Sequence, residues 1–358
     1  MRLTNHLSLL LLLCVGTALA ETATVKTGNG PKTPVINPET NKIYIANFLS
    51  NTVTVIDGKD NSTVTLKVGT APICNAINLK TNKIYVVNNK SDNLTVIDGK
   101  DNSMTNVKVG GGPNCVAVNE KTNKIYVGNF DDGTVTVIDG TNNSTASVKA
   151  GEKPYAVAVN LVTNKVYVAN IEGNTVTVID GANNSTASVD VGNHPRFLAV
   201  NSTTNKVYVA NRDGANVSVI DGANNSVTSV RVAPKPYSVA VNEKTNKIFV
   251  PHYASGNAAF VTEIDGATNG VLAIKTGDCP YDVTVDSESN TIYVANYCAG
   301  SMTKIDGSNN ATTTFAAGKS PSSIGFNSTT HKVYVCNFES ADVTIFGESP
   351  KAGEPAKK

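Results

Sequence analysis

Apolar and polar residues alternate along this chain in short runs that turn residues separate. In the segment 153–192, apolar and β-branched residues fill 155–159 and 166–170, and they alternate with polar residues over 175–179 and 186–191. Turn-forming residues stand between the runs, as in Asn160–Lys165 and Asp180-Gly181. Runs of this length and composition, bounded by Asn, Asp and Gly, are typical of β-strands. The pattern therefore predicts four short antiparallel strands joined by tight turns.

This four-strand unit is repeated along the chain. A Tyr-x-x-Asn motif, with Phe and His in one copy, recurs every 41 residues except for one step of 44. An Ile-Asp-Gly motif and a glycine position follow the same spacing. The aromatic residue of the successive copies is Tyr44, Tyr85, Tyr126, Tyr167, Tyr208, Phe249, Tyr293 and Tyr334. Four strands repeated at this period predict the blades of a β-propeller.

The two ends of the repeat array predict how the ring closes. Residues 23–28 match the fourth strand of a unit, whereas the last unit ends after its third strand, at residues 342–346. We expect the N-terminal strand to complete the last blade, which removes the open edges that invite aggregation. The fold class is therefore all-β, an eight-bladed propeller of four-stranded antiparallel blades, with a seven-bladed ring as the alternative.

Short segments outside the repeats indicate how the chain is processed. Arg2, the apolar run 7–15 and the Ala18-Leu19-Ala20 site have the pattern of a secretory signal peptide. We therefore expect residues 1–20 to be a signal peptide, 21–347 a single propeller domain and 348–358 a disordered tail. We expect a monomer without a membrane span, secreted or periplasmic, with the cell surface as the alternative location.

Composition excludes one class of function. The chain has 30 Lys and Arg against 29 Asp and Glu, and charged residues are only 16% of the total. A balanced and sparse charge gives no reason to expect a nucleic-acid partner.

The motifs carry a resemblance to a known family. Tyr-Val-Ala-Asn, followed by Val-Thr-Val-Ile-Asp-Gly and then Val-Gly-x-x-Pro, resembles the YVTN family of β-propeller repeats over nearly the whole mature chain. That family is found mainly in exported and surface-layer proteins of bacteria and archaea. The resemblance implies the propeller fold and an exported protein, but its motif residues are structural and imply no catalytic set.

The repeated residues themselves are expected to be structural. We expect the Asp of Ile-Asp-Gly to accept hydrogen bonds within its own turn, and the Gly that follows to supply a positive φ. The Asn of Tyr-x-x-Asn is expected to tie the end of the second strand to nearby backbone.

Residues that the repeat does not require gather on one face of the predicted ring. We call this the top face; it carries the connections between strands two and three and between successive blades. Aromatic and charged side chains there predict a ligand site at the top centre, for an unknown protein, peptide or glycan. The alternative is that they cap a filled channel. The candidate ligand-binding residues are His194, Arg196, Tyr237, His252, Tyr253, Tyr281 and Asp282.

We interpret the protein as a binding or scaffold protein rather than an enzyme, with two alternatives. The first is a propeller lyase or hydrolase that uses His194 or His252 as general base. The second is a metal or redox protein that uses Cys74 and Cys115, which occupy the same position in neighbouring blades and would be free thiols, a disulfide or a Cu(I) site. No spaced metal-binding motif is present, so we assign no metal, cofactor or catalytic residue. Cys279 and Cys298 are a candidate disulfide.

Overall fold

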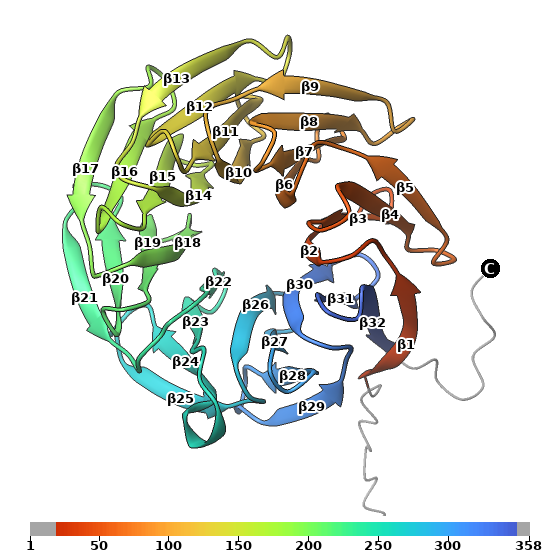
Figure 1. Ribbon diagram of the computed structural model, residues 1–358. Coiled ribbons are helices and arrows are strands. Elements are labelled where there is room, and N and C mark those ends of the chain that lie inside the picture. The colour runs from red at the N-terminus through yellow and green to blue at the C-terminus, as the bar shows by residue number, and fades with distance from the viewer. Residues whose placement is uncertain (1–18, 349–358) are drawn as a thin grey trace, which may run out of the picture.

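The computed structural model describes residues 19–348, which form a closed ring of eight four-stranded antiparallel sheets (Figure 1). The predicted eight-bladed propeller is confirmed. Within these residues the one helix is a short 3-10 turn, η1 (Gly256–Ala258). None of the described helices is long and apolar enough to cross a membrane.

Each blade runs from an inner strand at the channel to an outer strand at the rim. The strands of blades 1 to 4 are β2 (Pro31–Asn37), β3 (Lys42–Asn47), β4 (Thr52–Asp57), β5 (Thr63–Lys67); β6 (Pro72–Asn78), β7 (Lys83–Asn88), β8 (Asn93–Asp98), β9 (Met104–Lys108); β10 (Pro113–Asn119), β11 (Lys124–Asn129), β12 (Thr134–Asp139), β13 (Thr145–Lys149); β14 (Pro154–Asn160), β15 (Lys165–Asn170), β16 (Thr175–Asp180) and β17 (Thr186–Asp190). Those of blades 5 to 8 are β18 (Pro195–Asn201), β19 (Lys206–Asn211), β20 (Asn216–Asp221), β21 (Val227–Arg231); β22 (Ala240–Asn242), β23 (Lys247–Pro251), β24 (Phe260–Asp265), β25 (Val271–Lys275); β26 (Pro280–Asp286), β27 (Thr291–Asn296), β28 (Ser301–Asp306), β29 (Thr312–Ala316); β30 (Pro321–Asn327), β31 (Lys332–Asn337), β32 (Asp342–Glu348) and β1 (Leu19–Lys26).

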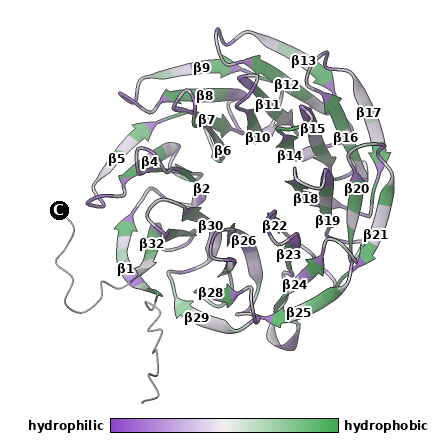
Figure 2. Ribbon diagram, turned by 180° about the vertical axis from the view of Figure 1, so that it is seen from behind, coloured by the Kyte–Doolittle hydropathy of each residue, from purple (hydrophilic) through white to green (hydrophobic). Residues whose placement is uncertain are grey.

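The hydrophobic core lies between neighbouring blades. In β15 every residue after Lys165 is buried, whereas in the outer strand β17 only Val189 is. Tyr167 and Val176 of blade 4, for example, pack against Val207 of blade 5. Figure 2 shows the same division by hydropathy, with apolar residues in the strands and polar residues in the turns. Burial of both faces of each sheet explains the nearly continuous apolar runs of the second and third strands.

The turns confirm the role expected for the repeated Asp and correct the one expected for the repeated Gly. The Lys59 N–H donates to Asp57 Oδ1 at 2.9 Å, and Asn41 has a φ of 54°. Gly58 does not have a positive φ, which is taken instead by Asn61 at 62°. A Cβ on Gly58 would lie 2.3 Å from Asn41 Oδ1. Gly is therefore required by the close approach of the two turns of a blade, not by φ.

The repeated Asn at the end of each second strand binds side chains rather than backbone. Asn47 is fully buried, and its Nδ2 donates to Thr52 Oγ1 at 3.0 Å and to Thr54 Oγ1 at 2.9 Å. A Cβ on Gly28 would lie 2.9 Å from this Asn, which explains the recurring glycine. The motif thus joins the second and third strands of a blade by hydroxyl contacts, and the expected backbone contact is corrected.

A ring of amide pairs joins the blades on the bottom face, and we call it the asparagine belt. In each pair, the Asn at the end of an inner strand donates from Nδ2 to the Oδ1 of a turn Asn in the next blade. The pairs are Asn37–Asn82, Asn78–Asn123, Asn119–Asn164, Asn160–Asn205, Asn201–Asn246, Asn242–Asn290 and Asn327–Asn41, at 2.8–2.9 Å. Between blades 7 and 8, Asp286 and His331 take these positions, with Oδ2 and Nδ1 3.9 Å apart.

The two ends of the chain meet in blade 8, where β1 pairs antiparallel with β32 (Figure 1). Lys26 Nζ lies 3.0 Å from Asp342 Oδ2, which adds an ion pair to the closure. The expected N-terminal strand does complete the last blade. Most of the expected signal peptide and tail lie outside the described residues; Leu19 and Ala20 open β1, and Glu348 ends β32. The domain boundaries therefore stay predictions.

Candidate functional site

A β-bulge at the start of the inner strands turns side chains into the channel. In blade 4, Pro154 pairs with Asn170 and Ala156 with Ala169, so Tyr155 is an extra residue without a partner. The same shift occurs in blades 2, 3, 5, 7 and 8, and one residue later in blade 1. An extra residue bends the strand and redirects its side chains. Two successive residues of an inner strand therefore face the channel.

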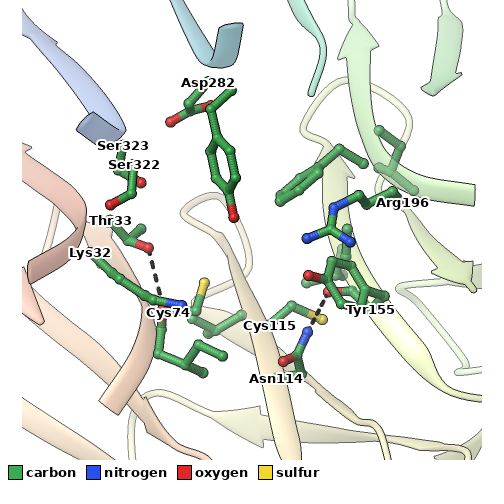
Figure 3. Close-up of a pocket in the computed structure, with 17 residues that line it drawn as sticks. Lys32, Thr33, Cys74, Asn114, Cys115, Tyr155, Arg196, Asp282, Ser322 and Ser323 are labelled. Atoms are coloured by element: carbon green, nitrogen blue, oxygen red, sulfur yellow. Dashed lines mark hydrogen bonds between the residues drawn. The ribbon is translucent and has the colours of Figure 1, made fainter. Parts of the chain in front are cut away.

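These residues line a central cavity of about 240 Å³ (Figure 3). Most of its wall consists of the residue after the repeat Pro and the residue that follows it. The lining residues are Lys32, Thr33, Ile73, Cys74, Asn114, Cys115, Val116, Tyr155, Ala156, Val157, Arg196, Phe197, Leu198, Tyr281, Asp282, Ser322 and Ser323. Blade 6 contributes none of them, because its inner strand β22 is short and begins only at Ala240.

Arg196 is held by aromatic rings instead of a carboxylate. Its guanidinium carbon lies 4.8 Å from the ring centre of Tyr155 and 3.9 Å from that of Tyr237. Arg196 also donates a hydrogen bond to the Tyr237 hydroxyl. Its Nε is buried without a hydrogen-bond partner, and no acid of residues 19–348 forms a salt bridge with it. The side chain is thus fixed in place while its charge stays unneutralised.

A cluster of tyrosines from blades 6 and 7 lies beside Arg196, and of these Tyr281 lines the cavity. The Tyr237 hydroxyl donates to the Tyr281 hydroxyl at 2.6 Å, and the ring of Tyr281 stacks on Tyr297 at 5.4 Å. Tyr253 contacts Tyr237, with ring centres 5.5 Å apart. Burial raises the pKa of Tyr237, so its hydroxyl stays protonated and acts as a donor.

Lys32 brings a second positive charge to the cavity. Its Nζ lies 4.8 Å from the ring centre of Phe48 and 5.5 Å from that of Phe338. Burial, and then the charge of Arg196, lowers the pKa of Lys32. Within residues 19–348 it has no acidic partner at salt-bridge distance. Both cationic side chains of the cavity therefore lack a counter-ion in the described part of the chain.

Asp282 is the one carboxyl among the residues that line this cavity, and neutral donors satisfy it. Ser238 Oγ and the Val283 N–H donate to its Oδ1, each at 3.0 Å, and the Ile324 N–H donates to its Oδ2 at 3.2 Å. Burial raises the pKa of Asp282. This residue ties blades 6, 7 and 8 together at the channel without pairing with either cation.

The two cysteines of the cavity are free thiols. Cys74 is half-buried and Cys115 is buried, and burial raises the pKa of both. A Cβ on Gly128 would lie 2.5 Å from Cys115 Sγ, so the glycine makes room for this thiol. No group of three or more His, Cys, Asp or Glu in the described part of the chain could hold a metal ion. Raised pKa values favour protonated thiols over the thiolates that bind metals or react.

The structure does not bring all of the predicted site residues together. Arg196, Tyr281 and Asp282 line the cavity, and Tyr237 and Tyr253 stand behind Arg196 and Tyr281.

Both histidines lie outside the cavity lining. His252 is fully buried inside blade 6; its Nδ1 donates to the Pro234 carbonyl at 3.1 Å, and its Nε2 accepts from Thr262 Oγ1 at 2.7 Å. Burial lowers the pKa of His252 to about 4. His194 has a φ of 60°, and its Nδ1 lies 3.4 Å from Asp213. His194 therefore contacts the loop after β19 and is not among the residues that line the cavity.

Cys279 and Cys298 are joined in a disulfide, with Cα atoms 5.2 Å apart, as expected from the sequence. The bond links the residue before β26 to the loop after β27. Tyr281 and Tyr297 are close to these cysteines in the chain, so the disulfide supports the aromatic wall of blade 7.

Several lining residues were not among the sequence candidates. Lys32, Asn114 and Ser322 occupy the same repeat position as Arg196 and Tyr281, and Thr33 and Ser323 follow two of them. Their shared position after the repeat Pro was the sequence signal that could have identified them. The unusual residues are concentrated in blades 4 to 7, whereas the cavity lining comes from seven blades.

Together these features define an eight-bladed β-propeller with a small, cationic central cavity. Two solved structures share the fold. Hydrazine synthase from Kuenenia stuttgartiensis matches with a TM-score of 0.63 and 18% identity, over 91% of this chain and 98% of that one. Sqt1 from Saccharomyces cerevisiae matches with a TM-score of 0.78 and 9% identity, over 92% and 99%. No family model and no curated protein matches the sequence. Identities this low show the fold alone.

Proposed function

We propose that the protein is an exported propeller of the YVTN type that binds a small ligand in its central cavity. The observation that carries this proposal is Arg196, which Tyr155 and Tyr237 hold in the cavity wall although no acid of residues 19–348 pairs with its charge. An unpaired charge in a partly enclosed cavity costs free energy, which a bound polar or anionic ligand would recover. A channel that served only as packing would gain stability from an apolar residue at this position.

Two observations support the exported location. Residues 1–20 have the pattern of a secretory signal peptide, and the Cys279–Cys298 disulfide suits an oxidising compartment. The test is the intact mass of the protein from the periplasm or medium. We expect a chain that starts at Glu21 and carries one disulfide and three free thiols. A chain that keeps residue 1 and stays in the cytoplasm would contradict export.

Binding is favoured over the lyase or hydrolase alternative. A general base must reach the substrate, but His252 is enclosed by its own blade and His194 lies at the rim. The metal or redox alternative is also less favoured, because burial holds the cavity thiols in their protonated form.

The binding function is tested by filling the cavity. The purified protein is screened by thermal shift against small acids, sugars, amino acids and short peptides, and hits are measured by calorimetry. We expect a hit with one site per chain and at least tenfold weaker binding in Asn114→Trp, which places an indole in the cavity. Val162→Trp adds the same side chain at an exposed turn and should bind normally. Equal binding by Asn114→Trp, or no hit at millimolar concentration, would overturn the proposal.

A further inference from the structure

The cavity holds two cationic groups that no acid of residues 19–348 neutralises. Lys32 and Arg196 belong to blades 1 and 5, on opposite sides of the ring, and both reach the cavity (Figure 3). Other cations of the fold are paired where acids are near; Lys247, for example, lies 3.0 Å from Glu263 and 2.9 Å from Asp265. Keeping two like charges in a partly enclosed space costs free energy, because each is desolvated and repels the other.

The one acid in the cavity wall does not offset this charge. Both oxygens of Asp282 already accept hydrogen bonds from neutral donors on three blades. Because burial raises the pKa of this carboxyl, its charge is weakened rather than stabilised. The positive charge of Lys32 and Arg196 therefore remains for a ligand.

Two tyrosines of the wall add a hydroxyl donor and a flat surface. The Tyr281 hydroxyl accepts a hydrogen bond from Tyr237, which leaves its own proton for a ligand oxygen. Tyr155 presents an aromatic ring beside Arg196. The volume of about 240 Å³ is slightly below the ~300 Å³ at which drug-sized sites begin, so the ligand must be small.

We propose that the cavity binds a small, flat dicarboxylate, with one carboxylate at Arg196 and Tyr281 and the other at Lys32. Arg196 lines the cavity and offers planar N–H donors that match a carboxylate, and no acid of residues 19–348 pairs with it. Lys32 acts as a point charge on the opposite wall. This inference rests on the proposed binding function and names the chemical class of its ligand.

The experiment compares acids with their neutral isosteres. Binding of fumarate and of benzene-1,4-dicarboxylate is measured by calorimetry and compared with fumaramide and benzene-1,4-dicarboxamide, which have the same shape. We expect at least one of the two acids to bind and to do so at least tenfold more tightly than its diamide. The wild-type protein alone decides this point, so no variant has to fold for the proposal to be refuted.

Variants then assign the two charges. Lys32→Met and Arg196→Met should each weaken binding of the acid at least tenfold, whereas Lys32→Arg keeps the charge and should stay within a few-fold of the wild type. Lys26→Met removes a lysine outside the cavity and should leave binding unchanged. Circular dichroism checks the fold of each variant.

The possible failures of the two proposals are distinguishable. If neutral compounds bind as tightly as the acids and Asn114→Trp blocks them, the binding function holds and the dicarboxylate class is wrong. If monocarboxylates such as benzoate bind as tightly as dicarboxylates and Lys32→Met changes nothing, the second charge has no role and the proposal is overturned. If nothing binds in the cavity, both proposals fall.

Discussion

The two ends of the inner strands behave differently. At the bottom, Asn160 ends β14; its Nδ2 donates to Asn205, and its Oδ1 accepts from the N–H groups of Val162 and Thr163. At the top, the same strand starts with Pro154 and Tyr155, and Tyr155 lies beside Arg196, which has no acidic partner within residues 19–348. The belt repeats almost without change around the ring, whereas the cavity wall differs from blade to blade.

Within one inner strand, the bottom end therefore contributes to stability and the top end to the proposed binding function. Belt residues satisfy one another, so each contributes to the joint between neighbouring blades. Cavity residues keep charges and donors unsatisfied, so they cost stability that the rest of the fold supplies. If the comparison is right, substitutions at the two ends should change the unfolding free energy in opposite directions.

The largest effect on stability is expected at His252, which occupies the position of the repeated Asn in blade 6. Burial lowers the pKa of His252 from 6.5 to about 4, so the unfolded chain takes up its proton first as the pH falls. Above about pH 6.5 neutral His252 makes its full contribution to the unfolding free energy. About 3 kcal/mol of this contribution is lost by pH 4.

The check is urea denaturation from pH 7.5 to pH 4 on the wild type and on His252→Asn, which restores the repeat. The variant should show the smaller pH dependence. If the unfolding free energies of the two proteins fall in parallel with pH, His252 is not the cause of the pH dependence.

A smaller loss is expected from breaking one joint of the belt. Asn160→Ala removes three hydrogen bonds and leaves Asn205 Oδ1 without its donor, which should lower the unfolding free energy by about 2 kcal/mol. Asn142→Ala, in an exposed turn with a single hydrogen bond, serves as the control and should cost less than about 1 kcal/mol. Equal losses would mean that the belt adds nothing beyond ordinary turns.

The opposite sign is expected in the cavity. Lys32→Met removes a buried charge that faces Arg196, so the unfolding free energy should rise by up to about 1 kcal/mol. Chemical denaturation in the absence of ligand measures this. A loss of more than about 1 kcal/mol would show that Lys32 supports the fold, and the contrast between the two ends would fail.

The smallest effect is expected at the irregular joint of the belt. His331→Asn should change stability by less than about 0.5 kcal/mol at pH 7, because His331 is more than half exposed and 3.9 Å from Asp286. An Asn also tolerates the φ of 53° at this position. Thermal unfolding of the variant gives the comparison, and a marked loss of stability would show that the ion pair is required.

Periodicity predicted the blades, their number and the closing strand, because every repeat must place the same residues in the same core. The cavity was harder to predict. A regular strand points successive side chains to opposite faces, yet Arg196 and Phe197 both line the cavity, because a bulge intervenes. No residue pattern was used to predict this bulge. His194 was placed in the site from its position in the repeat, but its left-handed backbone turns it away.

Closure of the ring through β1 and β32 affects both the unfolding of the protein and its folding during synthesis. A linear repeat array frays from its two ends, and each end repeat leaves more easily than an inner one. The closed ring has no end repeat, so the detachment of any blade breaks two joints at once. During synthesis, however, β1 cannot pair until residues 342–348 have been made. The seven complete blades therefore form an open arc until β32 is available to close the ring.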